Sequence, residues 1–212
     1  VLPTGSIGGS CLASGECSAL TADVSDPDGT VTTFAWNFGD GSPTASGATV
    51  SHTYTTTGTY TITLTATDDQ GGTSTFTKNV TVKALPPVPS DQYGSVIAAD
   101  NPYLYWRLDE ASGSVATDYS RYGNDGTYYG ATTLGQSSTV AGTDTAVGLD
   151  SNGWVSSDNQ FASPSTFTAE AWFNTTYAGG RIIGFSSAKD GTSGNYDRHV
   201  YLNGSGQLVF GV

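Results

Sequence analysis

The chain has 212 residues, 36% of them hydrophobic and 11% aromatic, which is enough apolar material for packed cores in one or two domains. Seven Lys and Arg stand against 19 Asp and Glu, so the formal net charge is −12 at pH 7. This charge argues against nucleic acid or an anionic membrane surface as a partner, because both would repel the chain. A membrane-spanning helix needs about 18 consecutive apolar residues, and no apolar run in the sequence is that long, so membrane insertion is not expected.

Two cysteines, Cys11 and Cys17, lie six residues apart in a stretch rich in Gly and Ser. A metal site would need further Cys or His at ligand spacing, which this stretch lacks. The two alternatives are free thiols and a disulfide across a short hairpin. We favour the disulfide, which predicts an oxidising compartment outside the cytoplasm.

Apolar and polar residues alternate with a period of two through most of the first 82 residues. Residues 59–67 alternate Thr with Tyr, Ile, Leu and Ala, which predicts a strand with one buried face and one threonine face. Residues 34–38 place Phe, Trp and Phe on one face of another strand. Lys78 falls on an inward face, which predicts a bulge or an edge strand there. Short strands with turns every 8–12 residues or so predict an all-β sandwich.

A proline-rich stretch, residues 83–90, holds three prolines within four positions and stiffens the chain. We therefore expect a first domain at 1–83, a linker at 84–93 and a second domain at 94–212. In the second domain the sequence predicts a short helix at 95–99 and strands at 103–108, 146–149, 167–174, 181–185, 199–202 and 207–212.

The first 83 residues resemble a PKD domain, an immunoglobulin-like repeat. The matching motifs are DPDG at 26–29, WNFGDG at 36–41, VSHTY at 50–54, GTY at 58–60 and LTATDD at 64–69. The family usually carries Asp where this chain has Asn37. The resemblance implies a non-catalytic spacer or binding module of a secreted or surface protein. It also implies a disulfide between the first two strands, as in bacterial members.

The second domain resembles the first part of a LamG-like, concanavalin A-like jelly roll. The motifs are YWRLDE at 105–110, DYSRYGNDG at 118–126, TAVGLD at 145–150 and FTAEAWF at 167–173. The later strands of that family have no counterpart here, so the jelly roll is expected to be incomplete at Val212. The explanations are a fragment, a truncated chain, or completion by another chain that adds a strand. The absence of Met, even at position 1, likewise suggests a processed or excised chain.

Calcium is the cofactor that these resemblances imply. Ca²⁺ takes oxygen ligands from flexible loops. In this chain Asp26 and Asp28 lie in one turn and Asp68 in another, and the two turns can share one end of an immunoglobulin-like sandwich. Calcium-binding PKD domains use that end, so the resemblance implies these three residues as ligands. The alternative is that the aspartates only cap their own turns. In the second domain the resemblance implies ligands among Glu110, Asp118, Asn124 and Asp125, against the alternative of solvated loop acids.

The sequence lacks the catalytic motifs for which we searched. The sequence has no Gly-x-Ser-x-Gly, His-Glu-x-x-His or Walker motif, and only three glutamates. Glu170 has no second acid at a spacing suited to glycoside hydrolysis. We therefore predict that the chain is not an enzyme.

The sequence predicts a non-catalytic extracellular binding or adhesion region that recognises a glycan or a protein surface, with structural calcium. The weak ligand candidates are Trp154, Tyr196 and Arg198, since aromatic faces and an Arg fork suit sugars. The first alternative is the accessory, substrate-targeting part of a secreted polysaccharide-degrading enzyme. The second is a structural subunit of a phage tail or surface appendage.

Overall fold

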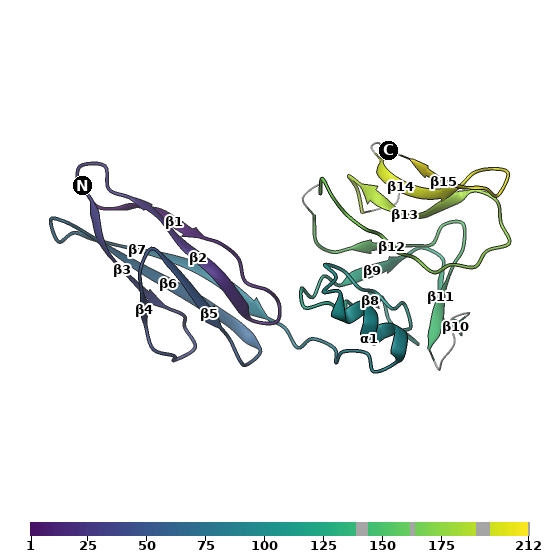
Figure 1. The fold of residues 1–212 in the computed structure, drawn as a ribbon, viewed down its shortest axis with the longest axis horizontal. Helices are drawn as coiled ribbons and strands as arrows, with labels where there is room; N and C mark the ends of the chain where they lie inside the picture. The colour runs from purple at the N-terminus through teal and green to yellow at the C-terminus, as the bar shows by residue number, and fades with distance from the viewer. Residues whose placement is uncertain (139–143, 162–163, 190–195, 212) are drawn as a thin grey trace. The chain divides into compact units, whose positions relative to one another are not determined.

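The structure is a computed structural model that describes residues 1–138, 144–161, 164–189 and 196–211 (Figure 1). The chain divides into two compact units, which we treat separately: residues 1–87 with 101–103 and 120–123, and residues 88–100, 104–119 and 124–212. Nearly all regular structure is antiparallel strand, which confirms the all-β fold class. No helix in the described part is long and apolar enough to span a membrane.

The N-terminal unit contains two antiparallel sheets. One has the strand order β1-β2-β5 and the other β4-β3-β6-β7. Their bounds are β1 (Thr4–Gly8), β2 (Glu16–Ser25), β3 (Val31–Asn37), β4 (Ala45–Ser46), β5 (Thr49–Thr53), β6 (Gly58–Asp68) and β7 (Thr73–Val82).

The core of this unit is the apolar face of each strand. Ile62, Leu64 and Ala66 of β6 are fully buried, while the threonines between them face outward, as the alternation predicts. Leu20 of β2 and Trp36 of β3 join the same buried cluster from the two sheets. The Trp36 indole nitrogen donates to the carbonyl oxygen of Gly47 at 2.9 Å, so its one polar group is satisfied. The two sheets thus form the predicted immunoglobulin-like sandwich.

Two further predictions for this unit are confirmed. A disulfide joins Cys11, in the loop after β1, to Cys17 at the start of β2. Lys78 lies on β7, the edge strand, and the β6–β7 ladder runs without a register shift, so the edge alternative is right and the bulge is absent from this ladder. The Lys78 ammonium donates to the backbone carbonyls of Ile7 and Gly9.

The second unit combines one helix with small antiparallel sheets. These have the orders β12-β9-β8, β10-β11 and β13-β14-β15. The bounds are α1 (Gln92–Ala99), β8 (Val115–Ala116), β9 (Gly126–Tyr129), β10 (Thr132–Ser137), β11 (Thr145–Leu149), β12 (Trp154–Ser157), β13 (Gly180–Ser186), β14 (Tyr196–Leu202) and β15 (Leu208–Gly211). The predicted helix is confirmed and starts earlier, because the Asp91 carboxylate caps it by accepting from the Gly94 amide at 2.6 Å.

Two strand predictions in this unit were wrong. Residues 167–174 pair with no strand in the described part of the chain and are largely exposed, despite their regular alternation. Residues 103–108 contribute a single bridge between Trp106 and Asp118. Alternation fixes which side chains share a face, but a strand forms only where a second strand supplies hydrogen bonds.

Candidate functional site

The acidic end of the N-terminal unit brings together two turns, as the sequence predicts. Asp26 and Asp28 follow β2, and Asp68 ends β6. Asp68 is buried, and one of its carboxylate oxygens accepts from the Gln70 amide at 2.9 Å and from the Gly72 amide at 2.7 Å. This carboxylate therefore organises its own turn, which is the chemistry of the alternative prediction.

Asp26 is the carboxylate of this cluster that lacks hydrogen bonds. Both of its oxygens are inaccessible to solvent and accept no hydrogen bond from the described residues. Burial, followed by the neighbouring Asp28 carboxylate, raises the pKa of Asp26. Asp28 in turn accepts from the nitrogen of Val1 at 2.6 Å.

Asp69 also faces the cluster, although sequence analysis did not select it. A Cβ added to Gly29 would lie 2.5 Å from a carboxylate oxygen of Asp26 and 2.5 Å from one of Asp69. Because glycine has no Cβ, position 29 leaves space for both carboxylates. In the described part of the chain, however, no three His, Cys, Asp or Glu side chains converge as a metal site.

The second predicted acidic set lies close together in the second unit. Asp118 is fully buried, with one oxygen accepting from the Tyr105 amide at 2.8 Å and the other from the Asn124 amide at 2.6 Å. Asp125 accepts from the Asp118 amide at 3.0 Å. Asp118 is therefore a loop anchor rather than a solvated acid, and its role as a calcium ligand stays a prediction.

Glu110 forms a separate pair of hydrogen bonds. One of its oxygens accepts from the Thr117 amide at 2.7 Å and the other from the Tyr128 hydroxyl at 2.5 Å. Burial and the Glu110 carboxylate raise the pKa of Tyr128. Both carboxylate oxygens already accept hydrogen bonds, so this glutamate positions two segments of the unit.

The predicted ligand residues Trp154 and Arg198 contact other protein groups. Trp154 stacks on Tyr129, with ring centroids 5.3 Å apart, and its indole nitrogen donates to the Lys189 carbonyl at 2.8 Å. The Arg198 guanidinium lies over two phenyl rings, at 5.5 Å from Phe167 and 5.4 Å from Phe185. The side chain of Tyr196 lies outside the described part of the structure.

Sequence analysis missed a polar cluster around an exposed tryptophan. The Trp172 indole nitrogen donates to the Tyr93 hydroxyl oxygen at 2.5 Å and to a Glu170 carboxylate oxygen at 3.1 Å. The Tyr93 hydroxyl donates to the same Glu170 oxygen at 2.5 Å. The two rings meet edge to face, with centroids 5.8 Å apart. We call Tyr93, Glu170 and Trp172 the Trp172 cluster.

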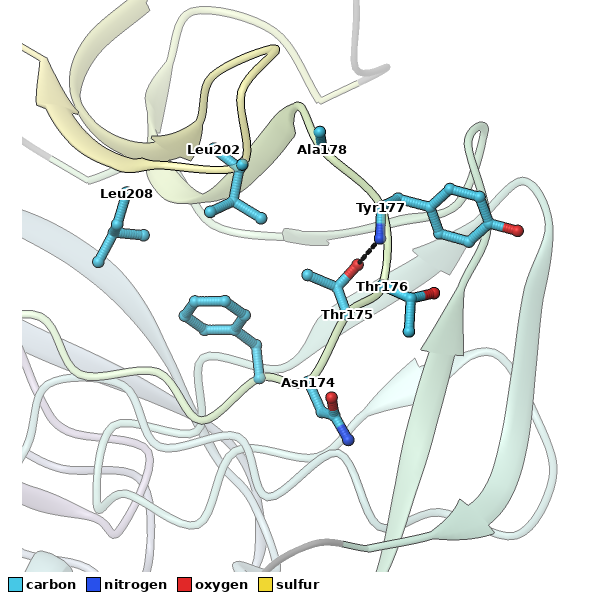
Figure 2. A pocket seen from close by; sticks show the side chains of 9 residues that line it. Asn174, Thr175, Thr176, Tyr177, Ala178, Leu202 and Leu208 are labelled. Carbon is cyan, nitrogen blue, oxygen red and sulfur yellow. Dashed lines mark hydrogen bonds between the residues drawn. The ribbon is translucent and has the colours of Figure 1, made fainter.

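An open groove of about 500 Å³ lies beside this segment of the chain (Figure 2). Phe173, Leu202 and Leu208 give it apolar lining, and residues 174–176 add an amide and two hydroxyl groups. Tyr177 at its margin is 80% exposed. Apolar and neutral polar groups thus share one open surface.

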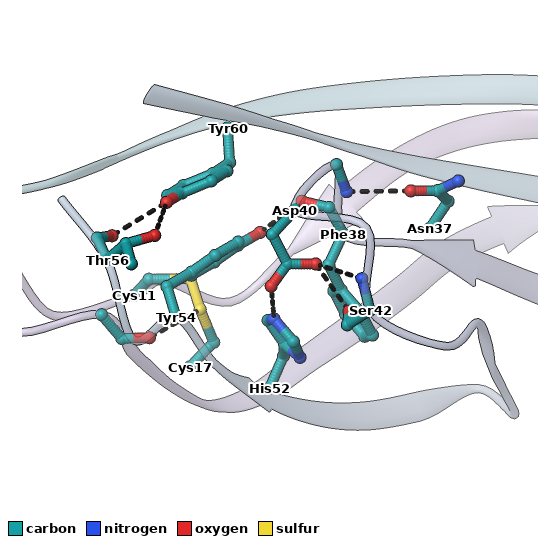
Figure 3. Close-up of polar contacts among 12 residues, drawn as sticks. Cys11, Cys17, Asn37, Phe38, Asp40, Ser42, His52, Tyr54, Thr56 and Tyr60 are labelled. Carbon is teal, nitrogen blue, oxygen red and sulfur yellow. Dashed lines mark hydrogen bonds and ion pairs between the residues drawn. A yellow bond between two sulfur atoms is a disulfide. The ribbon is translucent and has the colours of Figure 1, made fainter. Parts of the chain in front are cut away.

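A hydrogen-bonded loop follows β3 in the N-terminal unit (Figure 3). Asp40 accepts from the Ser42 hydroxyl at 2.6 Å and contacts the His52 imidazole at 2.7 Å, and His52 stacks on Phe38. Burial alone would raise the pKa of Asp40, but the hydrogen bonds from Ser42 and His52 hold it at about 2. Ser42 donates to Asp40 and not to His52, so the three groups are not arranged as a nucleophile and its base.

Comparisons with known proteins agree on the first unit. Residues 2–84 match the PKD domain family. The PKD1 domain of Vibrio anguillarum Epp is 31% identical, with a TM-score of 0.37; the match covers 40% of this chain and 96% of that one. The PKD1 domain of the Vibrio cholerae metalloprotease PrtV is 29% identical, with a TM-score of 0.33 and coverage of 39% and 96%.

One solved structure matches a longer part of the chain. It comes from a study of the promiscuous specificity of carbohydrate-binding modules from the β-sandwich superfamily. The identity is 20% and the TM-score 0.37, and the match covers 70% of this chain and 52% of that one. No curated protein matches the chain.

Proposed function

Residues 2–84 belong to the PKD domain family, and on that premise we propose that the chain is a non-catalytic extracellular region that binds carbohydrate or a surface partner. A disulfide in the same unit supports an oxidising location outside the cytoplasm. The net charge of −12 argues against nucleic acid and anionic membranes as partners.

The observation that carries this proposal is the open groove of the second unit. Its apolar lining from Phe173, Leu202 and Leu208 lies beside the amide of Asn174 and exposed Tyr177. Carbohydrate sites combine the same two elements, apolar surface for C–H groups and neutral polar groups for hydroxyls. Protein surfaces of this composition also attract partners, because apolar area remains in contact with water.

The arrangement of the titratable groups supports a binding role rather than catalysis. Glu110 and Asp118 accept backbone or tyrosine hydrogen bonds that fix loops. His52 contacts a carboxylate and aromatic rings, with Ser42 bonded to that carboxylate instead. The accessory role in a polysaccharide-degrading enzyme stays a prediction, as does the structural role in a phage tail or appendage.

Structural calcium at the acidic end of the N-terminal unit is part of the proposal. Asp26, Asp28 and Asp68 are the predicted ligands. The support is that both oxygens of Asp26 are inaccessible to solvent and accept no hydrogen bond from the described part of the chain. Carboxylate oxygens that are shielded from water and lack donors are unfavourable when charged, and a divalent cation would remove that penalty. Asp69 would add a fourth carboxylate to the same set.

A glycan array tests the binding proposal directly. The full chain is applied with and without Ca²⁺, and binding that chelation weakens is the expected result. An array without signal in both conditions, together with no retention on cell-surface preparations, would overturn the binding function.

The calcium site has its own test. Burial raises the pKa of Asp26, so its ionisation disfavours folding, and without calcium the N-terminal unit should lose stability as the pH rises through that pKa. Calcium at a hundredfold excess over its dissociation constant should add about 2.7 kcal/mol to the free energy of unfolding. Asp26→Asn should abolish this gain, whereas Asp23→Asn on the exposed part of β2 should keep it. An equal gain in both variants would exclude Asp26 as a ligand.

A further inference from the structure

Trp172 differs from the other three tryptophans by its exposure. Trp36 is fully buried, Trp106 is partly buried, and Trp154 is half-buried against Tyr129. Trp172 is 67% exposed. Tryptophan offers the largest apolar surface of any side chain, so leaving it in water forgoes the free energy that burial would supply.

The indole nitrogen of this exposed ring is hydrogen-bonded. Its indole nitrogen donates to both Tyr93 and Glu170, and Tyr93 donates to Glu170, so the three side chains close a hydrogen-bonded triangle. Tyr93 is anchored in turn, because it lies in the first turn of α1, which Asp91 caps. The ring edge is therefore held while no described aromatic ring stacks on its faces. A ligand that lands on such a face encounters a side chain that is already ordered.

The groups around the ring define the chemistry of a ligand. The second carboxylate oxygen of Glu170 accepts no hydrogen bond from the described residues, so it can accept from a ligand hydroxyl. An anionic ligand is disfavoured, because Glu170 is negative and the chain carries −12. A flat apolar face beside a free acceptor suits a pyranose ring, whose C–H groups stack while its hydroxyls donate.

We propose that the Trp172 cluster is a binding site for a neutral hexopyranose unit, with the sugar stacked on the Trp172 indole and one of its hydroxyls donating to Glu170. The inference rests on the proposed binding function and names the residues and the sugar class. Tyr93 is a positioning residue, since it holds the indole and the carboxylate in place.

A quaternary ammonium group is the competing ligand for aromatic rings near a carboxylate. Such cations bind where several ring faces enclose them. Here the Tyr93 and Trp172 rings meet edge to face, with an interplanar angle of 89°, and they join through their polar atoms. The exposed indole is thus not enclosed by a second ring face, which suits stacking on a sugar better than enclosure of a cation.

The first test is affinity electrophoresis of the full chain in gels that contain a soluble neutral or acidic polysaccharide. The second is titration of the full chain with tetramethylammonium. We expect binding to a neutral polysaccharide, with the ligand protecting tryptophan fluorescence from acrylamide quenching. Trp172→Ala should weaken this binding by about 30-fold, the loss typical of a central aromatic contact. Phe210→Ala is the matched control, because Phe210 is also an exposed aromatic residue and lies outside the cluster.

A second variant keeps the proposal testable if Trp172→Ala disturbs folding. Glu170→Gln retains an oxygen acceptor for Tyr93 and Trp172 but removes the charge, and it should weaken sugar binding severalfold with an unchanged melting temperature. Binding to neutral polysaccharide that survives both variants would overturn this site while the proposed function stands. Binding to acidic polysaccharide or tetramethylammonium alone would overturn the sugar assignment. No binding to any glycan would remove the premise itself.

Discussion

Asp40 anchors the loop after β3, and its replacement by Asn tests how that loop stabilises the N-terminal unit. In the folded chain the pKa of Asp40 lies at about 2, below its ordinary value of 3.8, because Ser42 and His52 bond to the charged form. Each pKa unit corresponds to about 1.4 kcal/mol, and the Asp40 side chain is only 17% exposed. Screening by solvent reduces the effect, so we expect Asp40→Asn to cost about 1–2 kcal/mol near neutral pH.

The dependence on pH separates charge from shape. A lowered carboxyl pKa adds stability above the ordinary value, and this contribution disappears as the pH falls from about 4 to about 2. The difference between wild type and Asp40→Asn should therefore shrink over that range. Urea unfolding at several pH values measures it, with NMR signals of Ile62 and Leu64 reporting this unit alone. Asp23→Asn, on the same unit, serves as the control.

A difference that stays constant from pH 7 to pH 2 would refute this reasoning, because it would show that the ionised carboxylate is not the source of the stability. The same conclusion would follow if Asp40→Asn and Asp23→Asn were equally stable at neutral pH.

Three further changes probe separate parts of the fold. Replacing Cys11 and Cys17 by Ser should cost about 2 kcal/mol, since the short loop that they close limits the entropic gain, and thermal melting without reductant checks it. Leu64→Ala should cost about 2–5 kcal/mol because Leu64 is fully buried, while Thr63→Ala on the outer face should change urea stability by less than about 1 kcal/mol. Asp118→Ala should destabilise the second unit by about 3 kcal/mol even in the presence of a chelator, because it removes the carboxylate that accepts from two backbone amides. A loss of stability seen only with calcium present would instead identify Asp118 as a calcium ligand.

Several elements could be predicted from sequence because their signal is local. The alternation of residues 59–67 places Ile62 and Leu64 inside and the threonines outside, as observed in β6. The two cysteines are six residues apart, close enough in sequence for a disulfide to close a short loop. The helix after the proline-rich stretch was also recognised, although its capping by Asp91 placed the start earlier.

The acidic residues show where local signals end. Asp26, Asp28, Asp118 and Glu110 were recognisable as turn or loop acids. Sequence alone does not say that Asp118 is fully buried with both oxygens bonded to amides. It also does not say that the two carboxylate oxygens of Asp26 are inaccessible to solvent and accept no hydrogen bond from the described residues. Burial and hydrogen-bond partners depend on which distant segments meet at the turn.

By itself the sequence determined the all-β class, since alternation is a property of neighbouring residues. The motifs of the first 83 residues carried the resemblance to PKD domains, and the disulfide was the favoured one of two alternatives for the cysteine pair. Only the tertiary structure decided the fate of residues 167–174, which alternate like a strand but find no partner strand in the described part. It also brought Trp172 to Tyr93, 79 residues away in the chain, to form a fixed and exposed ring. Such a contact has no sequence period, because it is set by the path of the chain rather than by the neighbours of either residue.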